Sequence, residues 1–297
     1  MTDERRSIRR MQSKNSRPEL RSAGLVQPRD LHFDTLAARD AHWLGGDPVG
    51  TAVLNALSLT FPDGEKLFMD AVRHFRPRLS GPLADEVGAF LAQEAMHARE
   101  HHALNAHLDA EKYPVAEILA TIRRRIATTR AKGPYAMLLA TIALEHFTAM
   151  MADMHMQHRG LFANADPQIT RLWRWHAMEE TEHKAVAFDV FCEVSGRWSP
   201  LKRYLLRTWS MAFITVTFTG NITRYATRLL QADGYREPAA RRAVRRFLWG
   251  DPGIFRRGWR AYFAWYRPGF HPWDLDNRAA LEDWRAEFDL PRSATPG

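Results

Sequence analysis

Two widely separated segments of the chain carry glutamate and histidine at helical spacing, and this pattern restricts the fold more than any other feature. Each segment holds a Glu-x-x-His pair and one further histidine, and the three side chains share one face of a helix. Two such faces indicate a site built between helices. The residues are Glu94, His97 and His101 in the first segment and His176, Glu180 and His183 in the second.

Helices are predicted around both segments, because apolar residues recur at helical spacing and Pro or Gly stands at most boundaries. Strand signals are almost absent. An extra helix between the second and third long helices gives the connectivity of a bundle with a long crossover. The sequence therefore predicts an all-α, ferritin-like four-helix bundle with a crossover helix and additional C-terminal helices. The expected helices cover residues 47–60, 62–75, 83–108, 113–129, 135–158, 167–194, 201–230 and 238–248.

Charge and composition divide the chain into three predicted parts. Residues 1–40 form a flexible basic arm that lacks the apolar run of a secretory signal, and residues 41–199 form the metal-binding bundle. Residues 200–297 form a basic, Trp-rich helical extension packed on the bundle. This extension has 17 Lys and Arg against 9 Asp and Glu, whereas the rest of the chain holds 25 of each, so it supplies the whole net charge of +8.

The first and third bundle helices each offer one glutamate to complete a metal site. Glu65 lies at the start of the first helix, and Glu145 interrupts the apolar run 136–144 in the third. A buried carboxylate among apolar residues is costly unless a cation or a partner compensates it. Two Glu-x-x-His pairs and one Glu from each other helix make up the dinuclear pattern of ferritin-like proteins. The predicted metal ligands are Glu65, Glu94, His97, Glu145, His176, Glu180 and His183.

Some assignments within this set stay open on sequence grounds. Glu179 competes with Glu180 for the ligand role, and Glu180 is preferred because it repeats the spacing of the other pair. Glu179 and His101 are then expected to be additional ligands or residues that orient the ligands. Of His101 and His176, one is expected to be an additional ligand and the other to orient a carboxylate. Lys184, which flanks the fourth helix, is expected in solvent.

Small residues share the face of Glu145 and predict a pocket beside the metals. Their size leaves room for dioxygen or a substrate, and nearby aromatic and aliphatic side chains would make the walls apolar. The predicted pocket residues are Thr141, Thr148, Ala149 and Ala152.

The ligand types restrict the metal. Cys192 is the single cysteine of the chain, which excludes an internal disulfide and any multi-cysteine zinc or iron–sulfur site. Imidazole ligands disfavour magnesium and calcium. Two iron ions are therefore expected, with manganese and zinc as alternatives.

The chain also resembles two known families. Residues 61–65, 93–101, 175–189 and 270–273 are similar to the bacterial family of predicted metal-dependent hydrolases, and this resemblance covers most of the chain. The ligand set and helix order resemble the seven-ligand diiron pattern of the p-aminobenzoate N-oxygenases, in which His176 would be the extra ligand. The second resemblance implies a site and not a substrate.

Three functions are compatible with these features. The first is a diiron oxidoreductase that uses dioxygen and an electron donor to oxidise a small or lipid-like substrate. The second is a two-metal hydrolase, as the family description implies, and the third is a non-enzymatic metal store or sensor. The chain lacks nucleotide-binding and nucleic-acid-binding motifs, so no nucleic-acid partner is expected, and the oligomeric state is left open.

The uncharged stretch 208–223 bears on localisation. It is shorter than the roughly 20 apolar residues that a spanning helix needs, and arginines flank it on both sides. It is therefore expected to be a buried or interfacial helix. The protein is predicted to be cytoplasmic, with a peripheral contact to the inner face of the membrane through the C-terminal extension.

Overall fold

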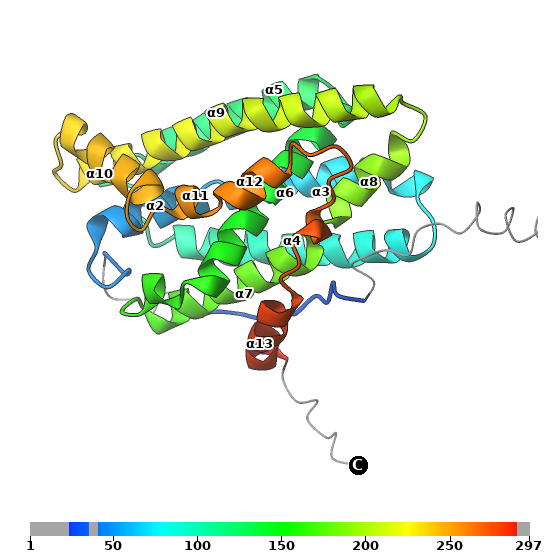
Figure 1. Ribbon diagram of the computed structural model, residues 1–297. Coiled ribbons are helices and arrows are strands. Elements are labelled where there is room, and N and C mark those ends of the chain that lie inside the picture. Colours follow the sequence, from blue (N-terminus) through cyan, green and yellow to red (C-terminus); the bar gives the residue numbers. More distant parts are fainter. Residues whose placement is uncertain (1–23, 36–40, 290–297) are drawn as a thin grey trace, which may run out of the picture.

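The computed structural model describes residues 24–35 and 41–289. This part of the chain is all-helical, without a strand, so the predicted all-α bundle is confirmed (Figure 1). The α-helices are α2 (Pro48–Ser58), α3 (Phe61–Phe75), α4 (Pro82–Asn105), α5 (Val115–Ala131), α6 (Pro134–Gln157), α7 (Pro167–His183), α8 (Val186–Val194), α9 (Pro200–Ala232), α10 (Glu237–Trp249), α11 (Ile254–Arg257), α12 (Trp259–Ala264) and α13 (Arg278–Phe288).

Local sequence signals set most of the helix starts. Asp47, Asp166 and Ser199 are N-cap residues whose side chains accept hydrogen bonds from backbone N–H groups of the first turn. A proline follows each of them, at a position where the missing N–H is not needed. Pro62 likewise lies in the first turn of α3, so the predicted break between residues 60 and 62 separates two helices.

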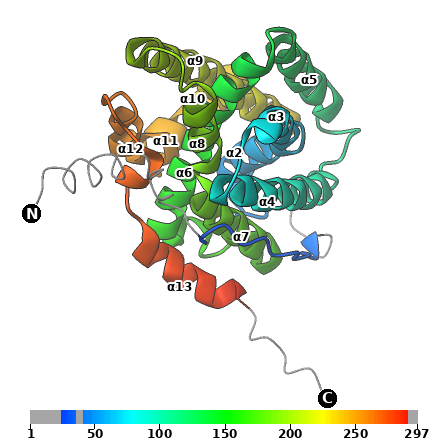
Figure 2. The same cartoon turned by 90° about the vertical axis from the view of Figure 1, so that its right-hand side faces the viewer.

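Helices α3, α4, α6 and α7 form the bundle, with α8 extending it at one end. The crossover helix α5 packs against α3 and α6, and α9 covers α2 and α6. Figure 2 shows the bundle end-on, with α5 and α9 on its outside and α13 against the opposite side. The bundle axis therefore carries the inward-facing side chains of four helices.

Helix α6 is the core of this arrangement. It is the one helix in the described ranges whose length and apolar composition would suit a membrane span, but most of its apolar stretch is buried inside the protein. It also contacts α3, α5, α7, α8 and α9. A helix that is apolar on all sides and covered by neighbours is typical of the centre of a helical protein.

The fourth predicted helix is interrupted where a single helix was expected. The chain breaks between α7 and α8 at Lys184, directly after His183. Lys184 is buried, so the prediction that it lies in solvent is wrong. Its Nζ donates to the Leu275 carbonyl oxygen at 2.7 Å and to Asn277 Oδ1 at 2.8 Å, and it lies 3.9 Å from the centre of the Trp273 ring. Burial of an ammonium group requires such partners.

The C-terminal third contains both buried and exposed tryptophans. Trp265, Trp273 and Trp284 are buried. Trp209 and Trp259 are exposed, together with other apolar residues of α9 and α12. The part of the Trp-rich extension that follows α10 thus forms the short helices α11, α12 and α13 and contributes buried tryptophans to the core.

Part of the predicted N-terminal arm lies within the described residues, and the remainder, residues 1–23 and 36–40, lies outside them. In residues 24–35, Val26 and Phe33 are buried, and Phe33 packs 5.4 Å from the Trp175 ring. Arg29 reaches α7, where it contacts Glu179 and Glu182. This segment therefore packs against the bundle.

Candidate metal centre

Helices α3, α4, α6 and α7 bring the seven predicted ligand residues together along the bundle axis. All seven are buried. Their potential ligand atoms form two groups, and within each group the atoms lie within 4.8 Å of one another. Either group can hold a metal ion. The first cluster is Glu65, His97, His176 and Glu180, and the second cluster is Glu94, Glu145 and His183.

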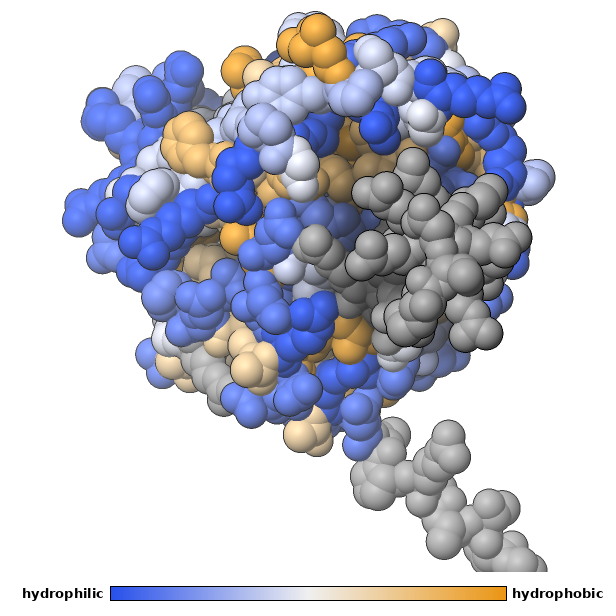
Figure 3. Space-filling model, turned by 45° about the vertical axis from the view of Figure 1, so that its right-hand side comes forward, coloured by the Kyte–Doolittle hydropathy of each residue, from blue (hydrophilic) through white to orange (hydrophobic). Residues whose placement is uncertain are grey.

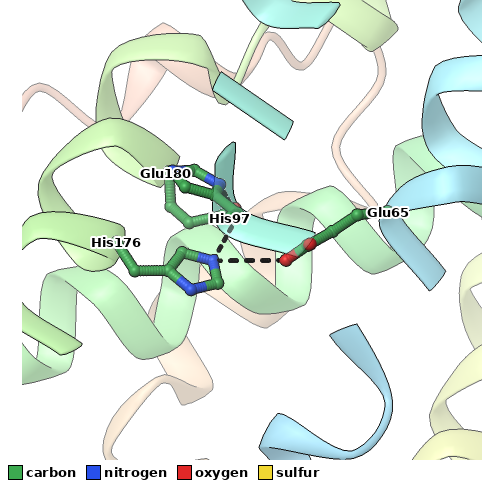
Figure 4. Close-up of side chains that lie close together, drawn as sticks. All are labelled: Glu65, His97, His176 and Glu180. Carbon is green, nitrogen blue, oxygen red and sulfur yellow. Dashed lines mark hydrogen bonds and ion pairs between the residues drawn. The ribbon is translucent and has the colours of Figure 1, made fainter. Parts of the chain in front are cut away.

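In the first cluster, four side chains from three helices point toward one another (Figure 4). His176 Nε2 lies 2.8 Å from Glu180 Oε1 and 3.8 Å from Glu65 Oε1. His97 Nδ1 lies 3.8 Å from the same oxygen of Glu180. These spacings allow two imidazoles and two carboxylates to surround one cation.

The second cluster is organised around His183. Its Nε2 lies 3.1 Å from Glu94 Oε1 and 3.5 Å from Glu145 Oε2. It also lies 3.5 Å from Oε2 of Glu180, whose other oxygen belongs to the first cluster. The carboxylate of Glu180 therefore spans both clusters, as a bridging ligand would.

Each Glu-x-x-His pair is divided between the two clusters. Glu94 lies with His183 of the opposite helix, and His97 lies with Glu180. Residues three apart on a helix share a face but differ by one turn in height. Helices α4 and α7 therefore contribute ligand atoms to both groups.

Hydrogen bonds fix which nitrogen of His176 faces the first cluster. Ser58 donates its hydroxyl proton to Asn105 Oδ1 at 2.7 Å, so Ser58 Oγ accepts from His101 Nδ1 at 2.9 Å. His101 Nε2 then accepts from His176 Nδ1 at 2.6 Å. This order leaves the lone pair of His176 Nε2 for a cation.

The other two histidines are oriented in the same way. His97 Nε2 donates to Glu179 Oε2 at 3.1 Å, which leaves Nδ1 facing the first cluster. His183 Nδ1 donates to Gln93 Oε1 at 3.0 Å, and its Nε2 faces the second cluster. All three imidazoles thus turn one nitrogen inward, where it could bind a cation in its unprotonated form.

Buried carboxylates without partners support the same interpretation. Both oxygens of Glu65, Glu94 and Glu145 are buried without a hydrogen-bond partner among the described residues. Burial raises the pKa of Glu65 and Glu145 well above the usual value, and the carboxylates of Glu94 and Glu180 raise it further. Cations at the cluster centres would compensate this charge. The residues present therefore fit two metal ions.

The geometry separates Glu180 from Glu179. Glu180 lies in the first cluster, whereas Glu179 lies outside both clusters and holds His97. Glu179 also accepts a hydrogen bond from Arg29 Nη1 at 3.4 Å. Burial raises the pKa of Glu179 to about 8, and Glu182 raises it while Arg29 lowers it. His101 also lies outside both clusters and orients His176.

A second layer of residues escaped the sequence interpretation. Gln93 donates from Nε2 to Glu182 Oε2 at 2.9 Å, and Glu182 pairs with Arg29 at 3.0 Å and with Arg285 at 2.6 Å. Glu179 and Glu182 are three residues apart, as Glu180 and His183 are. This spacing was a signal from which the sequence could have predicted that they share a face of the helix. The arginines lie far away in sequence, and no local pattern marks them or Ser58.

Two small cavities flank the first cluster. One, of about 50 Å³, is lined by His176 and Glu180, and the other, of about 120 Å³, is lined by Glu65. Thr148 lines both cavities, and Ala152 lines the first. Further lining residues are mostly apolar, among them Phe61, Leu57, Met151, Phe68 and Leu144.

The other two predicted pocket residues lie elsewhere. Thr141 is buried and donates to the Met137 carbonyl oxygen, and it lines neither cavity. Ala149 lines a different hollow that also contains Lys184. Helical spacing gives the face of α6 on which these residues lie, but the side chains of neighbouring helices decide where a cavity remains.

Comparison with known proteins agrees with the resemblance that the motifs indicated. A family model described as predicted metal-dependent hydrolase matches residues 27–276, a range that contains both clusters and the second layer except Arg285. No curated protein matches the chain, and no solved structure matches it. The chain therefore belongs to the family of predicted metal-dependent hydrolases.

Proposed function

We propose that the protein is a dinuclear metal enzyme that binds two iron ions and oxidises a small or lipid-like organic substrate with dioxygen. The observation that carries the proposal is the pair of buried clusters joined by Glu180. Four carboxylates and three neutral imidazoles would balance the charge of two divalent cations. Such mixed oxygen and nitrogen ligation without thiolate suits iron.

The residues of the chain have distinct parts in this proposal. Bound iron would supply redox chemistry toward dioxygen. Glu180 would hold the two ions at a fixed separation, and His97, His176 and His183 would keep their orientation through the outer hydrogen bonds. Pre-set ligand geometry of this kind removes the need to reorganise the site during reaction.

The cavities support a small or slender apolar substrate. Their volumes are about 50 and 120 Å³, and their walls are mostly apolar. Thr148 lines both cavities and donates from Oγ1 to the Glu145 carbonyl oxygen at 2.9 Å, so its hydroxyl proton is already used within the helix. Such walls exclude water and favour hydrocarbon over polar groups.

The second candidate is a two-metal hydrolase, which the family description favours. In that case one ion would lower the pKa of a bound water and the other would polarise an ester, amide or phosphate. The apolar cavity walls offer few donors for a polar substrate. We therefore place oxidation first.

Metal analysis combined with an oxygen test separates the two candidates. The full chain would be purified anaerobically from iron-supplemented cells, and its metal content and optical spectrum recorded before and after admission of oxygen. Two irons per chain with an oxygen-dependent absorption change are expected. Glu145→Ala should abolish the change, and Glu193→Ala, at an exposed position of α8, should not.

The contrary results are equally specific. Two zinc or manganese ions, no response to oxygen and cleavage of a chromogenic ester would favour the hydrolase. A chain that binds no metal under any of these conditions would rule out both candidates.

A further inference from the structure

A large hollow lies outside the metal centre, between α8, the start of α9 and residues 268–271. Its volume is about 840 Å³, and none of the seven cluster residues lines it. The walls are mainly apolar and aromatic, with Phe188, Phe191 and Phe270 among them. Arg203 and Arg207 line the same hollow, so two cations face an otherwise apolar space.

Arg207 is a buried cation whose charge is not compensated. It is 5% exposed, and no ion pair with a carboxylate is present for it in residues 24–35 and 41–289. Its Nη2 donates to the Arg267 carbonyl oxygen at 2.9 Å, but its Nη1 is buried without an acceptor in those residues, as is Nε of Arg203. Aromatic rings surround the guanidinium at 5.3 to 6.0 Å. A buried cation with unused donors is costly unless an anion binds there.

The one carboxylate that lines the hollow is already bound to a histidine. His271 Nδ1 accepts from the Trp273 backbone N–H at 3.1 Å, so its Nε2 carries the proton and donates to Asp189 Oδ1 at 3.0 Å. Two guanidinium groups against one carboxylate leave the hollow with a net positive charge. His271 and Trp273 belong to the 270–273 motif, to which the metal centre gives no role.

We propose that this hollow binds an organic anion, with a carboxylate or phosphate group held by Arg207 and Arg203 and an apolar body packed between Phe188 and Phe270. Guanidinium groups match such oxyanions in shape and charge. The aromatic walls would contact the hydrocarbon part. A ligand with these two parts is either a free amphiphilic acid or an anionic lipid.

Calorimetric titration of the metal-loaded full chain with octanoate tests the site, and octan-1-ol is the neutral comparison. Octanoate should bind at least about tenfold more tightly, because a hydrogen bond to a charged group contributes about 1.5–3 kcal/mol and about 1.4 kcal/mol is tenfold. Arg207→Gln and the less buried Arg203→Gln should each weaken octanoate binding by about tenfold. Arg224→Gln, at an exposed position on the same helix, should leave it unchanged.

Equal binding of octanol and octanoate would overturn the proposal, as would octanoate binding that neither arginine substitution weakens. Arg203→Gln keeps the test valid if the Arg207 variant does not fold. Phosphatidylglycerol vesicles that compete with octanoate would identify a lipid as the source, and vesicles that do not compete would identify a free acid.

The single cysteine gives an independent measurement in the unmodified protein. Cys192 lines the hollow, and burial raises the pKa of its thiol to about 12. Alkylation by a maleimide is therefore slow, and a bound anion should slow it several-fold further. An unchanged rate at saturating octanoate would mean that the ligand does not occupy this hollow.

A separate observation concerns the outer surface of α9. Five large apolar side chains recur every three or four residues and are 48% to 74% exposed, which places them in one stripe along the helix. Trp259 and Phe263 of α12 are exposed as well, and Thr215 of α9 contacts Tyr262 of α12 at 3.1 Å. Figure 3 shows hydrophobic atoms at the top of the molecule, where α9 lies in Figure 1. The stripe residues are Leu201, Leu205, Trp209, Phe213 and Val216.

We propose that the α9 stripe and α12 rest on an anionic membrane surface. The stripe exposes more contiguous apolar surface than a helix facing only water normally does, and exposed basic residues such as Lys202 and Arg260 lie on the same two helices. The C-terminal third carries 17 Lys and Arg against 9 Asp and Glu, which complements an anionic surface.

Co-sedimentation with phosphatidylglycerol vesicles at low salt tests this contact, with phosphatidylcholine vesicles as the neutral comparison. Binding to the anionic vesicles alone is expected, and Trp209→Ala with Phe213→Ala should weaken it about tenfold or more. Trp249→Ala, exposed on α10 outside the stripe, should have little effect. No sedimentation at low salt, or a solution dimer that the double variant dissociates, would overturn the proposal.

Discussion

The two clusters of the candidate metal centre are built from the same residue types but differ in their surroundings. The first cluster borders two apolar cavities through Glu65, His176 and Glu180. No member of the second cluster lines either cavity, and Glu94 and His183 are fully buried. A small molecule can therefore approach the first cluster more readily than the second.

The outer hydrogen bonds differ as well. In the first cluster, His176 is held by a neutral chain through His101 to Ser58. In the second, Gln93 connects His183 to Glu182, which the N-terminal segment and α13 neutralise through Arg29 and Arg285. Arg29 also contacts Glu179, which holds His97 of the first cluster, so the N-terminal segment supports both clusters, whereas Arg285 of α13 pairs with the network of the second. The first cluster is the reactive side in our proposal. The predictions below test this division.

The largest effect is expected at Glu180, where the two clusters meet. Glu180→Gln keeps the side-chain volume but removes the charge that faces both clusters, so metal content should fall from two ions per chain to fewer than one. Metal analysis by mass spectrometry after desalting measures this directly. A variant that keeps one full equivalent would mean that the clusters bind independently.

A smaller effect should distinguish the clusters from each other. Glu145→Gln leaves the second cluster with two unmodified members, whereas Glu65→Gln leaves the first with three. Loss of a hydrogen-bond partner of a ligand typically lowers metal affinity about 10–100-fold, so loss of a ligand itself should lower it further. The decrease in affinity should be larger for Glu145→Gln than for Glu65→Gln. Titration against a competing chelator ranks the two variants. The reverse ranking would contradict the assignment of three residues to one cluster and four to the other.

The outer network of the second cluster should give an intermediate effect. Gln93→Leu removes the acceptor for His183 Nδ1 and the link to Glu182. We expect about 10–100-fold weaker binding of one ion, with the other unchanged. The chelator titration should then give a two-step curve. Equally weakened binding of both ions would show that Gln93 acts through the whole bundle and not through His183.

The sequence predicted which carboxylates and imidazoles lie together, because helical spacing translates directly into a shared face. Glu145 stood out as a carboxylate inside an apolar run, and the structure brings it to His183 at 3.5 Å. The spacing also explains why Glu180 was preferred to Glu179, which the structure places outside both clusters. Such inferences need only local geometry.

What escaped prediction depends on contacts between distant segments. Arg29 and Arg285 are 256 residues apart in the chain numbering yet both pair with Glu182. Lys184 was expected in solvent, but residues 273–277 cover it. Helical periodicity carries no information on which loop covers a given turn. For the same reason two of four predicted pocket residues, Thr141 and Ala149, do not line the cavities at the first cluster.

The smallest predicted effect concerns His155, which lines the cavity beside the first cluster. Burial lowers the pKa of His155 to about 3, and neither ring nitrogen has a hydrogen-bond partner in the part of the chain described. The unfolded chain has a histidine pKa near 6.5, so below that pH the unfolded state binds the extra proton and the folded state does not. The folded state should therefore lose about 1.4 kcal/mol of stability through this residue by pH 5.5.

Replacing His155 by Phe should remove that loss. Urea unfolding of metal-free wild type and His155→Phe between pH 7.5 and 5.5 gives the difference in the free energy of unfolding, in which contributions from groups common to both proteins cancel. As pH falls, the free energy of unfolding of the variant should rise relative to that of wild type. Parallel pH profiles would mean that His155 takes up a proton in the folded state as readily as in the unfolded chain, and the cavity beside the first cluster would then be wet and polar, contrary to the apolar pocket that the proposed oxidation needs.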